Sequence, residues 1–96
     1  MDTVPELDPV LHQPVRTRIA MLLAARGEVS FSELKKALVL SNGNLDAHLK
    51  KLAAAGYLHT RFVLDSRPYT AYSLSRSGQA VFRKYASALQ ALLKQL

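Results

Sequence analysis

The chain contains no cysteine among its 96 residues. This absence excludes disulfides, thiol redox sensing and cysteine-ligated metals. No apolar run approaches the roughly 18 residues that are needed to span a bilayer. The N-terminus, MDTVPELDP, is acidic and lacks the basic and apolar regions of a signal peptide. We therefore expect a cytoplasmic protein.

Motifs of catalysis are also missing. The sequence has no glycine-rich phosphate loop, no cysteine nucleophile and no carboxylate pair that the predicted fold would gather around a pocket. Asp46 and Asp65 fall on a helix flank and in a turn as isolated groups, and His12, His48 and His59 show no ligand spacing. We expect neither an enzyme nor a metal site nor a cofactor.

Positive charge is abundant but unevenly placed. The net charge is +6, of which residues 1–33 carry three basic and five acidic side chains (−2) and residues 34–96 carry ten basic and two acidic ones (+8). This concentration indicates a polyanion as partner. The alternative is a basic surface that serves only solubility. Length and composition, 49% apolar and 21% charged, predict one folded domain.

Three helices are predicted in the first half of the chain. Asp8 and Pro9 predict a short helical piece, DPVLH, which Pro14 interrupts, and a helix follows over residues 14–26. The capping-box spacing of Ser30 and Glu33 predicts a helix over residues 31–38, preceded by a short strand in EVSF. A third helix is predicted over residues 41–55, between a capping Ser41 and a terminating Gly56.

The second half changes to strand-like periodicity. The segments YLHTRFVL and YTAYSLS flank the turn formers DSRP, which predicts a β-hairpin over residues 57–75. A long amphipathic helix is predicted over residues 76–95. This order of elements predicts a mainly α fold with a small β-hairpin, the winged helix-turn-helix, with extra N-terminal and long C-terminal dimerisation helices. It makes one domain of residues 1–96.

The third helix presents a face suited to DNA. With Leu45, Leu49 and Leu52 directed inward, a rotation of 100° per residue places a small and polar set outside. Small residues allow close approach to a groove, asparagines can hydrogen-bond base edges, and lysines further along suit phosphates. The outward and flanking residues are Asn42, Gly43, Asn44, Ala47, His48, Lys50 and Lys51.

Several stretches resemble a known family. The segments LDPVLHQPVRTRIAMLL, VSFSELKKALVLSNGNLDAHLKKLAAAGYL and YSLSRSGQAVFRKY are similar to the small winged-helix regulators related to the MarR and ArsR families. The resemblance implies a homodimeric, sequence-specific transcriptional regulator that binds double-stranded DNA. It implies a recognition helix from Ser41 to Lys51 and a wing in which Arg61, Ser66 and Arg67 contact DNA, Arg67 in the minor groove.

A dimer is also expected from the apolar residues themselves. The last helix, roughly 30 Å long, offers more apolar surface than a domain of this size can cover, and the N-terminal piece could lie against it. Two recognition helices on a two-fold axis predict a palindromic operator. The predicted interface residues are Leu7, Val10, Leu11, Phe82, Tyr85, Leu89, Leu92, Leu93 and Leu96.

Other interpretations stay open at this point. The C-terminal apolar stripe could close the core of one chain instead of a dimer. His48 could form a local hydrogen bond at the helix edge. The fold could serve protein association, or the regulator could be gated by a small apolar ligand held between the dimer helices.

Overall fold

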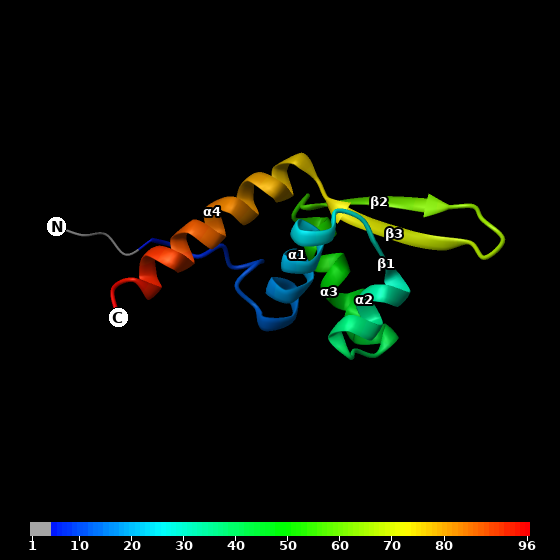
Figure 1. Ribbon diagram of the computed structural model, residues 1–96, viewed down its shortest axis with the longest axis horizontal. Helices are drawn as coiled ribbons and strands as arrows, with labels where there is room; N and C mark the ends of the chain where they lie inside the picture. Colours follow the sequence, from blue (N-terminus) through cyan, green and yellow to red (C-terminus); the bar gives the residue numbers. More distant parts are fainter. Residues whose placement is uncertain (1–4) are drawn as a thin grey trace.

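The computed structural model describes residues 5–96, so the first four residues of the acidic N-terminus, Asp2 among them, lie outside it. Four helices and three short strands follow one another along the described chain (Figure 1). Their bounds are α1 Pro14–Arg26, β1 Val29–Ser30, α2 Phe31–Leu38, α3 Asn42–Ala54, β2 Leu58–Val63, β3 Tyr69–Leu74 and α4 Arg76–Leu93.

Local capping chemistry sets most of these helix ends. Ser30 and Glu33 form the predicted capping box of α2, in which each residue's side chain accepts the other's backbone amide hydrogen. Ser41 and Ser75 accept amide hydrogens from the first turns of α3 and α4. Because Ser41 is the N-cap, α3 begins one residue later than predicted.

The N-terminal segment, residues 5–12, contains a single turn where the sequence predicted a helical piece. Asp8 accepts hydrogen bonds from the amides of Val10 and Leu11, and its carbonyl accepts from the amide of His12. The turn ends because Gln13, which precedes Pro14, is extended with φ −144° and ψ 129°. The residues that begin α1 therefore cannot continue the N-terminal turn.

The strands form one antiparallel sheet in the order β1-β3-β2. β1 pairs with β3 through Val29 opposite Tyr72, which adds a third strand to the predicted hairpin. β2 and β3 pair along six positions, from Leu58 opposite Leu74 to Val63 opposite Tyr69. The sheet thus anchors the base of the hairpin to the segment between α1 and α2.

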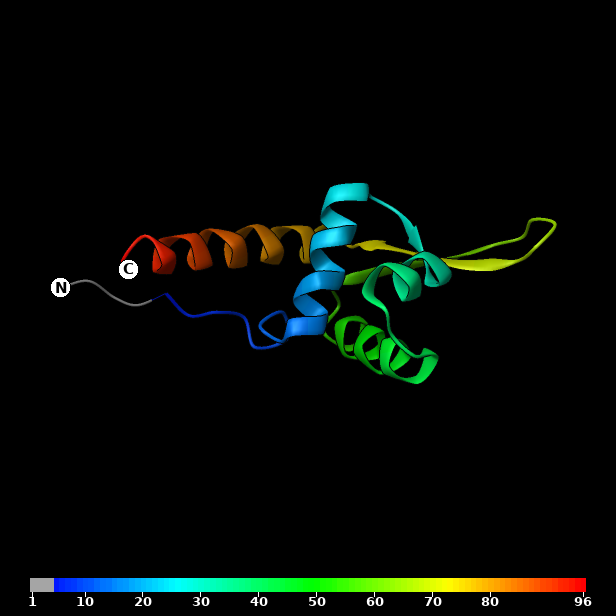
Figure 2. The same ribbon diagram turned by 60° about the horizontal axis from the view of Figure 1, so that its bottom comes forward.

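The core lies where α1, α2, α3 and the base of the sheet meet (Figure 2). Each helix supplies leucine or isoleucine at helical spacing, and all three predicted inner residues of α3 are buried. The largest fully buried side chains are Leu11, Ile19, Leu23, Val29, Leu34, Leu45 and Leu52. This core fixes α3 on one side and leaves its other side outside the protein.

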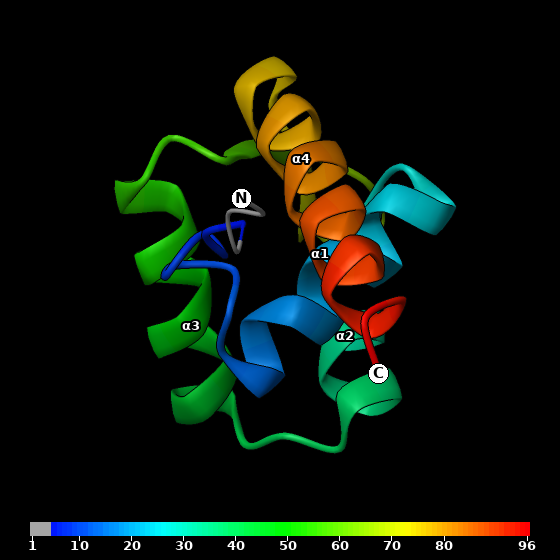
Figure 3. The same cartoon turned by 90° about the vertical axis from the view of Figure 1, so that its left-hand side faces the viewer.

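Two elements extend away from the core in opposite directions. The hairpin projects on one side and α4 on the other, which gives the molecule extents of 58 × 25 × 21 Å (Figure 1). The N-terminal segment runs alongside α4 and passes between α4 and α3 (Figure 3). No helix among residues 5–96 combines the length and apolarity needed to cross a bilayer. This arrangement is a winged helix, mainly helical with a β-hairpin wing.

Candidate nucleic-acid interface

α3 carries an exposed polar face directly opposite its buried one. Leu45, Leu49 and Leu52 lie in the core, whereas the first turn and the remaining outward positions are open to solvent. The exposed residues are Ser41, Asn42, Gly43, Asn44, Ala47, Lys50 and Lys51. Nothing lies within 4 Å of the point where a side chain on Gly43 would begin, so this face can approach a flat or grooved surface closely.

One acidic side chain interrupts this face and is neutralised within the helix. The Nζ atom of Lys50 lies 2.9 Å from Oδ2 of Asp46, one turn earlier. The carboxylate raises the pKa of Lys50, chiefly through this hydrogen bond. Exposed pairs at this spacing contribute little to stability, but the pair shields Asp46 from an approaching anion.

His48 lies on the flank of α3 and contacts α1. Its Nδ1 is 3.2 Å from Nη1 of Arg16, whose Nε donates to the carbonyl of Val10 at 2.6 Å. Burial lowers the pKa of His48, and the charge of Arg16 lowers it further. A neutral imidazole therefore accepts the hydrogen of the guanidinium, and Arg16 lies at the edge of the α3 face. The position of Arg16 could not be predicted from the sequence, because its partner is 32 residues away.

The turn between α2 and α3 holds a strained residue. Val39 has φ 54° and ψ 57°, the left-handed region that β-branched residues rarely adopt. Its side chain is 87% exposed, so packing against the core does not compensate the strain. The left-handed residue reverses the chain and allows α3 to leave α2 after three residues.

The two arginines of the wing, Arg61 and Arg67, have different surroundings. Arg61 lies midway along β2, and its guanidinium binds both carboxylate oxygens of Glu28, at 3.0 and 2.5 Å. This hydrogen bond is the main reason that the pKa of Glu28 is lowered and that of Arg61 raised. Arg67 lies at the exposed tip beside Ser66, whose amide donates to Asp65. Glu28, a residue of the acidic half, thus engages one of the two wing arginines.

Carboxylates form ion pairs with two of the four cations of α3 and the wing. Among residues 5–96 only two ion pairs form, Lys50 with Asp46 and Arg61 with Glu28. Lys51 and Arg67 therefore have no carboxylate partner within the described chain. Lys51 on α3 and Arg67 at the wing tip are thus free to meet an anion, with Asp65 two residues from Arg67.

The end of α3 is fixed to the start of α4. The hydroxyls of Ser75 and Ser77 both donate to the carbonyl of Gly56, at 2.7 and 2.9 Å. Gly78 packs so closely that a Cβ atom there would lie 2.2 Å from the backbone oxygen of Tyr57. The Tyr57 hydroxyl in turn donates to Oδ2 of Asp8 at 2.6 Å and so holds the N-terminal segment at the same junction.

The residues predicted for a dimer interface divide into two groups. Leu11 and Tyr85 are buried within one chain, which corrects the expectation that they are available to a partner. The Tyr85 hydroxyl lies 3.0 Å from His12 Nδ1 and 3.3 Å from Thr17 Oγ1, so it joins the N-terminal segment to α1 and α4. The others keep exposed apolar surface, partly for Leu7, Val10, Phe82, Leu89 and Leu92 and largely for Leu93 and Leu96.

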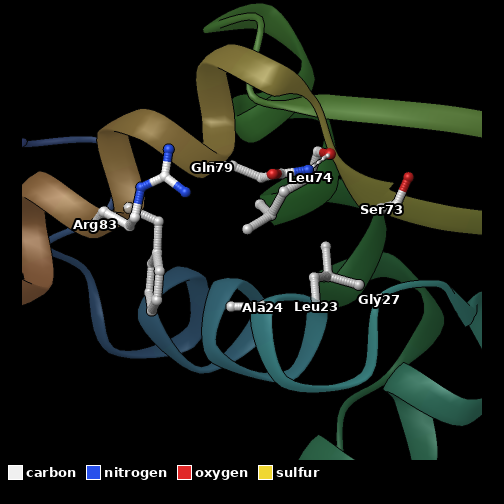
Figure 4. A pocket seen from close by; sticks show the side chains of 8 residues that line it. Leu23, Ala24, Gly27, Ser73, Leu74, Gln79 and Arg83 are labelled. Carbon is white, nitrogen blue, oxygen red and sulfur yellow. Dashed lines mark hydrogen bonds between the residues drawn. The ribbon is translucent and has the colours of Figure 1, made fainter.

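A pocket of about 460 Å³ opens between α1, the end of β3 and the first turns of α4 (Figure 4). Leucines and Phe82 form its apolar wall, and Arg83 lies at one side. Gln79 donates to the carbonyl of Leu74 and closes one end. Elsewhere in residues 5–96, no three histidine, aspartate or glutamate side chains lie close enough to hold a metal ion.

The fold is that of a winged helix, and comparison with known proteins agrees. The winged helix DNA-binding domain family matches residues 15–93, and the chain belongs to this family. A structure described as a transcriptional regulator homologue from Pyrococcus horikoshii OT3 is 32% identical, with 90% of this chain and 86% of that chain covered and a TM-score of 0.85.

Two further proteins are similar over different lengths. An uncharacterized protein of Methanocaldococcus jannaschii is 32% identical over 88 residues, which cover 91% of this chain and 96% of the relative. Bacillus subtilis PadR in complex with operator DNA is 19% identical, with 77% of this chain and 48% of that chain covered and a TM-score of 0.66. PadR therefore shares the fold.

Proposed function

We propose that the protein is a sequence-specific transcriptional regulator that binds a palindromic operator as a homodimer. The observation that carries the proposal is the exposed α3 face, in which small and amide side chains precede Lys50 and Lys51. The asparagines would read base edges in the major groove, and the lysines would contact phosphates. The operator-bound structure of PadR, which shares the fold, supports this use of it.

The wing supplies the second contact of the proposal. Arg67 at the exposed tip would enter the minor groove beside the site that α3 occupies, where the negative potential favours a guanidinium. Ser66 would contact a backbone phosphate from the same turn. Arg61 would contribute only after exchanging Glu28 for a phosphate, because the carboxylate binds it in the free protein.

The dimer would form along α4. Its outer end extends beyond the core next to the N-terminal segment (Figure 3). An open groove of about 510 Å³ is lined by residues of this segment and of α4. Leu93 remains 58% exposed and Leu96 fully exposed. A second α4 related by a two-fold axis would cover this apolar surface and present two copies of α3 to successive turns of duplex DNA.

The first test is selection of duplexes from a randomised DNA library, followed by affinity measurements against salt concentration. The native protein should select a palindrome, and Lys51→Ala and Arg67→Ala should each weaken binding and reduce the slope of log affinity against log salt by about 0.9. Arg26→Ala, at the exposed far end of α1, is the charge-matched control and should leave the slope unchanged. Equal affinity of about 10⁻⁴ to 10⁻⁶ M for all duplexes, unaffected by either variant, would refute the regulator and favour protein association.

The dimer is tested separately by light scattering. Leu93→Glu should produce monomers and abolish selection of the two-part site, because it places a charge in the proposed interface. Met21→Glu, which alters an apolar residue of similar exposure on α1, should stay dimeric. A native monomer that still selects a single half-site would overturn the dimer and leave DNA recognition in place.

A second proposal is gating by a small apolar ligand, favoured by the pocket between α1 and α4 (Figure 4). A ligand there would contact both the core and the proposed dimer helix. A panel of small aromatic compounds should include members that release the operator from the native protein and fail to release it from Ala24→Phe, which fills the pocket. No release by any compound, or equal release from both proteins, would count against this pocket.

A further inference from the structure

The wing carries exposed apolar side chains that the DNA-contacting set does not include. Phe62 is 62% exposed and Leu64 is 80% exposed. Single exposed apolar residues are common on protein surfaces and need no explanation. Phe62 and Leu64, however, lie together next to the wing tip that carries Arg67, and this grouping requires an explanation.

The pairing register places Phe62 on one face of the hairpin, and Leu64 follows just beyond the end of β2. Side chains directly opposite each other share a face, and every second residue along a strand does so too. Phe62 lies opposite Thr70, and Thr60 lies opposite Tyr72. Phe62 therefore extends the face that carries Tyr72, and Leu64 lies in the loop directly after β2. We call Phe62 and Leu64 the apolar edge of the wing.

This face is the one directed toward the helical core. At its inner end Tyr72 lies opposite buried Val29, and both Tyr72 and Leu58 pack against the core. Burial raises the pKa of Tyr72, and so, to a smaller extent, does the charge of Asp46 on α3. Toward the tip the hairpin leaves the core (Figure 2), so that no described element covers the outer part of the same face. Phe62 thus lies on the side of the wing that faces the helical core, and Leu64 is next to it at the tip.

From this placement we infer that the apolar edge is a DNA-binding surface, with Leu64 and Phe62 against the deoxyribose walls of the minor groove that Arg67 enters. The occupant follows from continuity, since Phe62 and Leu64 adjoin the wing tip from which Arg67 is proposed to enter the groove. Apolar side chains inserted beside a minor-groove arginine also open base steps and bend the duplex toward the major groove. The inference rests on the proposed function.

The experiment uses the full chain and the duplex chosen in the selection described above. Phe62→Ser and Leu64→Ser should each lower affinity by about tenfold, the order expected when one apolar side chain is no longer buried. The salt slope should stay unchanged, because no charge is removed, in contrast to Arg67→Ala. Energy transfer between labelled duplex ends should report a smaller bend with both serine variants.

Controls separate this surface from general effects. Met21→Ser removes an apolar side chain of 55% exposure on α1 and should bind like the native protein. Leu64→Met retains the apolar contact and should restore affinity and bending. Thermal unfolding should confirm that the serine variants are folded, as expected for side chains so exposed.

The outcomes distinguish the two proposals. Native-like affinity of both serine variants, with Arg67→Ala still impaired, would overturn the apolar edge and leave the regulator intact. A changed oligomeric state at unchanged DNA affinity would assign the edge to contacts between protein chains and overturn it as well. If the native protein selects no duplex, both proposals fall together.

Discussion

Replacing Tyr57 by phenylalanine removes a hydroxyl that joins the N-terminal segment to the junction of α3 and β2. The hydroxyl donates to Oδ2 of Asp8 over 2.6 Å, a short hydrogen bond to a charged acceptor. Such bonds contribute about 1.5–3 kcal/mol when buried, and both partners here are half-buried. We therefore expect Tyr57→Phe to lower the free energy of unfolding by about 1–2 kcal/mol.

The assay is urea unfolding followed by circular dichroism, in a double-mutant cycle with Asp8→Asn. Asparagine keeps the oxygen that accepts the amides of Val10 and Leu11, so the N-terminal turn is retained. The coupling energy between positions 8 and 57 should be about 1 kcal/mol. A coupling below about 0.3 kcal/mol, the additivity error of such cycles, would refute the reasoning.

The same bond gives a pH dependence with a definite sign. The hydrogen bond to Asp8, followed by burial, raises the pKa of Tyr57 to about 12. An unfolded tyrosine ionises near pH 10, so the stabilisation is fully present below about pH 10 and disappears as the pH rises through 12. The difference in stability between native protein and Tyr57→Phe should shrink over this interval. A difference that stays constant to pH 12 would show that the hydroxyl does not donate to Asp8.

Two further predictions concern the backbone. Gly78→Ala should lower the free energy of unfolding by about 3 kcal/mol, because its Cβ would meet the backbone oxygen of Tyr57 at 2.2 Å. Gly43→Ala, which places its Cβ in open space, should not lower it. Equal denaturation midpoints for the two variants would contradict the close packing at Gly78. Val39→Gly should raise the free energy of unfolding by about 1 kcal/mol, because glycine adopts the left-handed conformation without strain. Ala37→Gly, at an exposed position of α2, should lower it by a similar amount. Calorimetric melting temperatures that shift in the same direction for both variants would argue against strain at position 39.

The helix bounds could be predicted from the sequence because they depend on neighbouring residues. Pro14 begins α1, Ser30 and Glu33 cap α2, and Ser41 caps α3, each through contacts within a few residues. The periodic leucines of α3 then separate its buried and exposed faces. Local chemistry was therefore enough to predict the winged helix and to select the residues of its exposed face.

Contacts between distant residues were not available from spacing. Arg16 meets His48 across 32 residues, and Arg61 meets Glu28 across 33. In neither case does the local sequence indicate the partner, so neither Arg16 nor Glu28 could be predicted to lie beside the α3 face or the wing. The pairing of β1 with β3 and the burial of Leu11 depend in the same way on the assembled fold.

The apolar pattern of α4 was informative about amphipathicity but not about which surface it covers. Tyr85 and Leu93 belong to one stripe in the sequence, yet one is buried beneath the N-terminal segment and the other is exposed. The segment covers the inner part of the stripe only. A stripe that serves both the core of one chain and the proposed dimer cannot be divided without knowing where the N-terminal segment lies.

The contacts at Gly56 and Tyr57 connect the end of α3 firmly to the start of α4. Ser75 and Ser77 hold the carbonyl of Gly56, and Gly78 leaves no room for the helix to slide. α4 extends for about 27 Å from these contacts, so a small tilt of α4 in the proposed dimer would also tilt α3. The crossing angle of the two α4 helices would then set the half-site spacing that the regulator accepts.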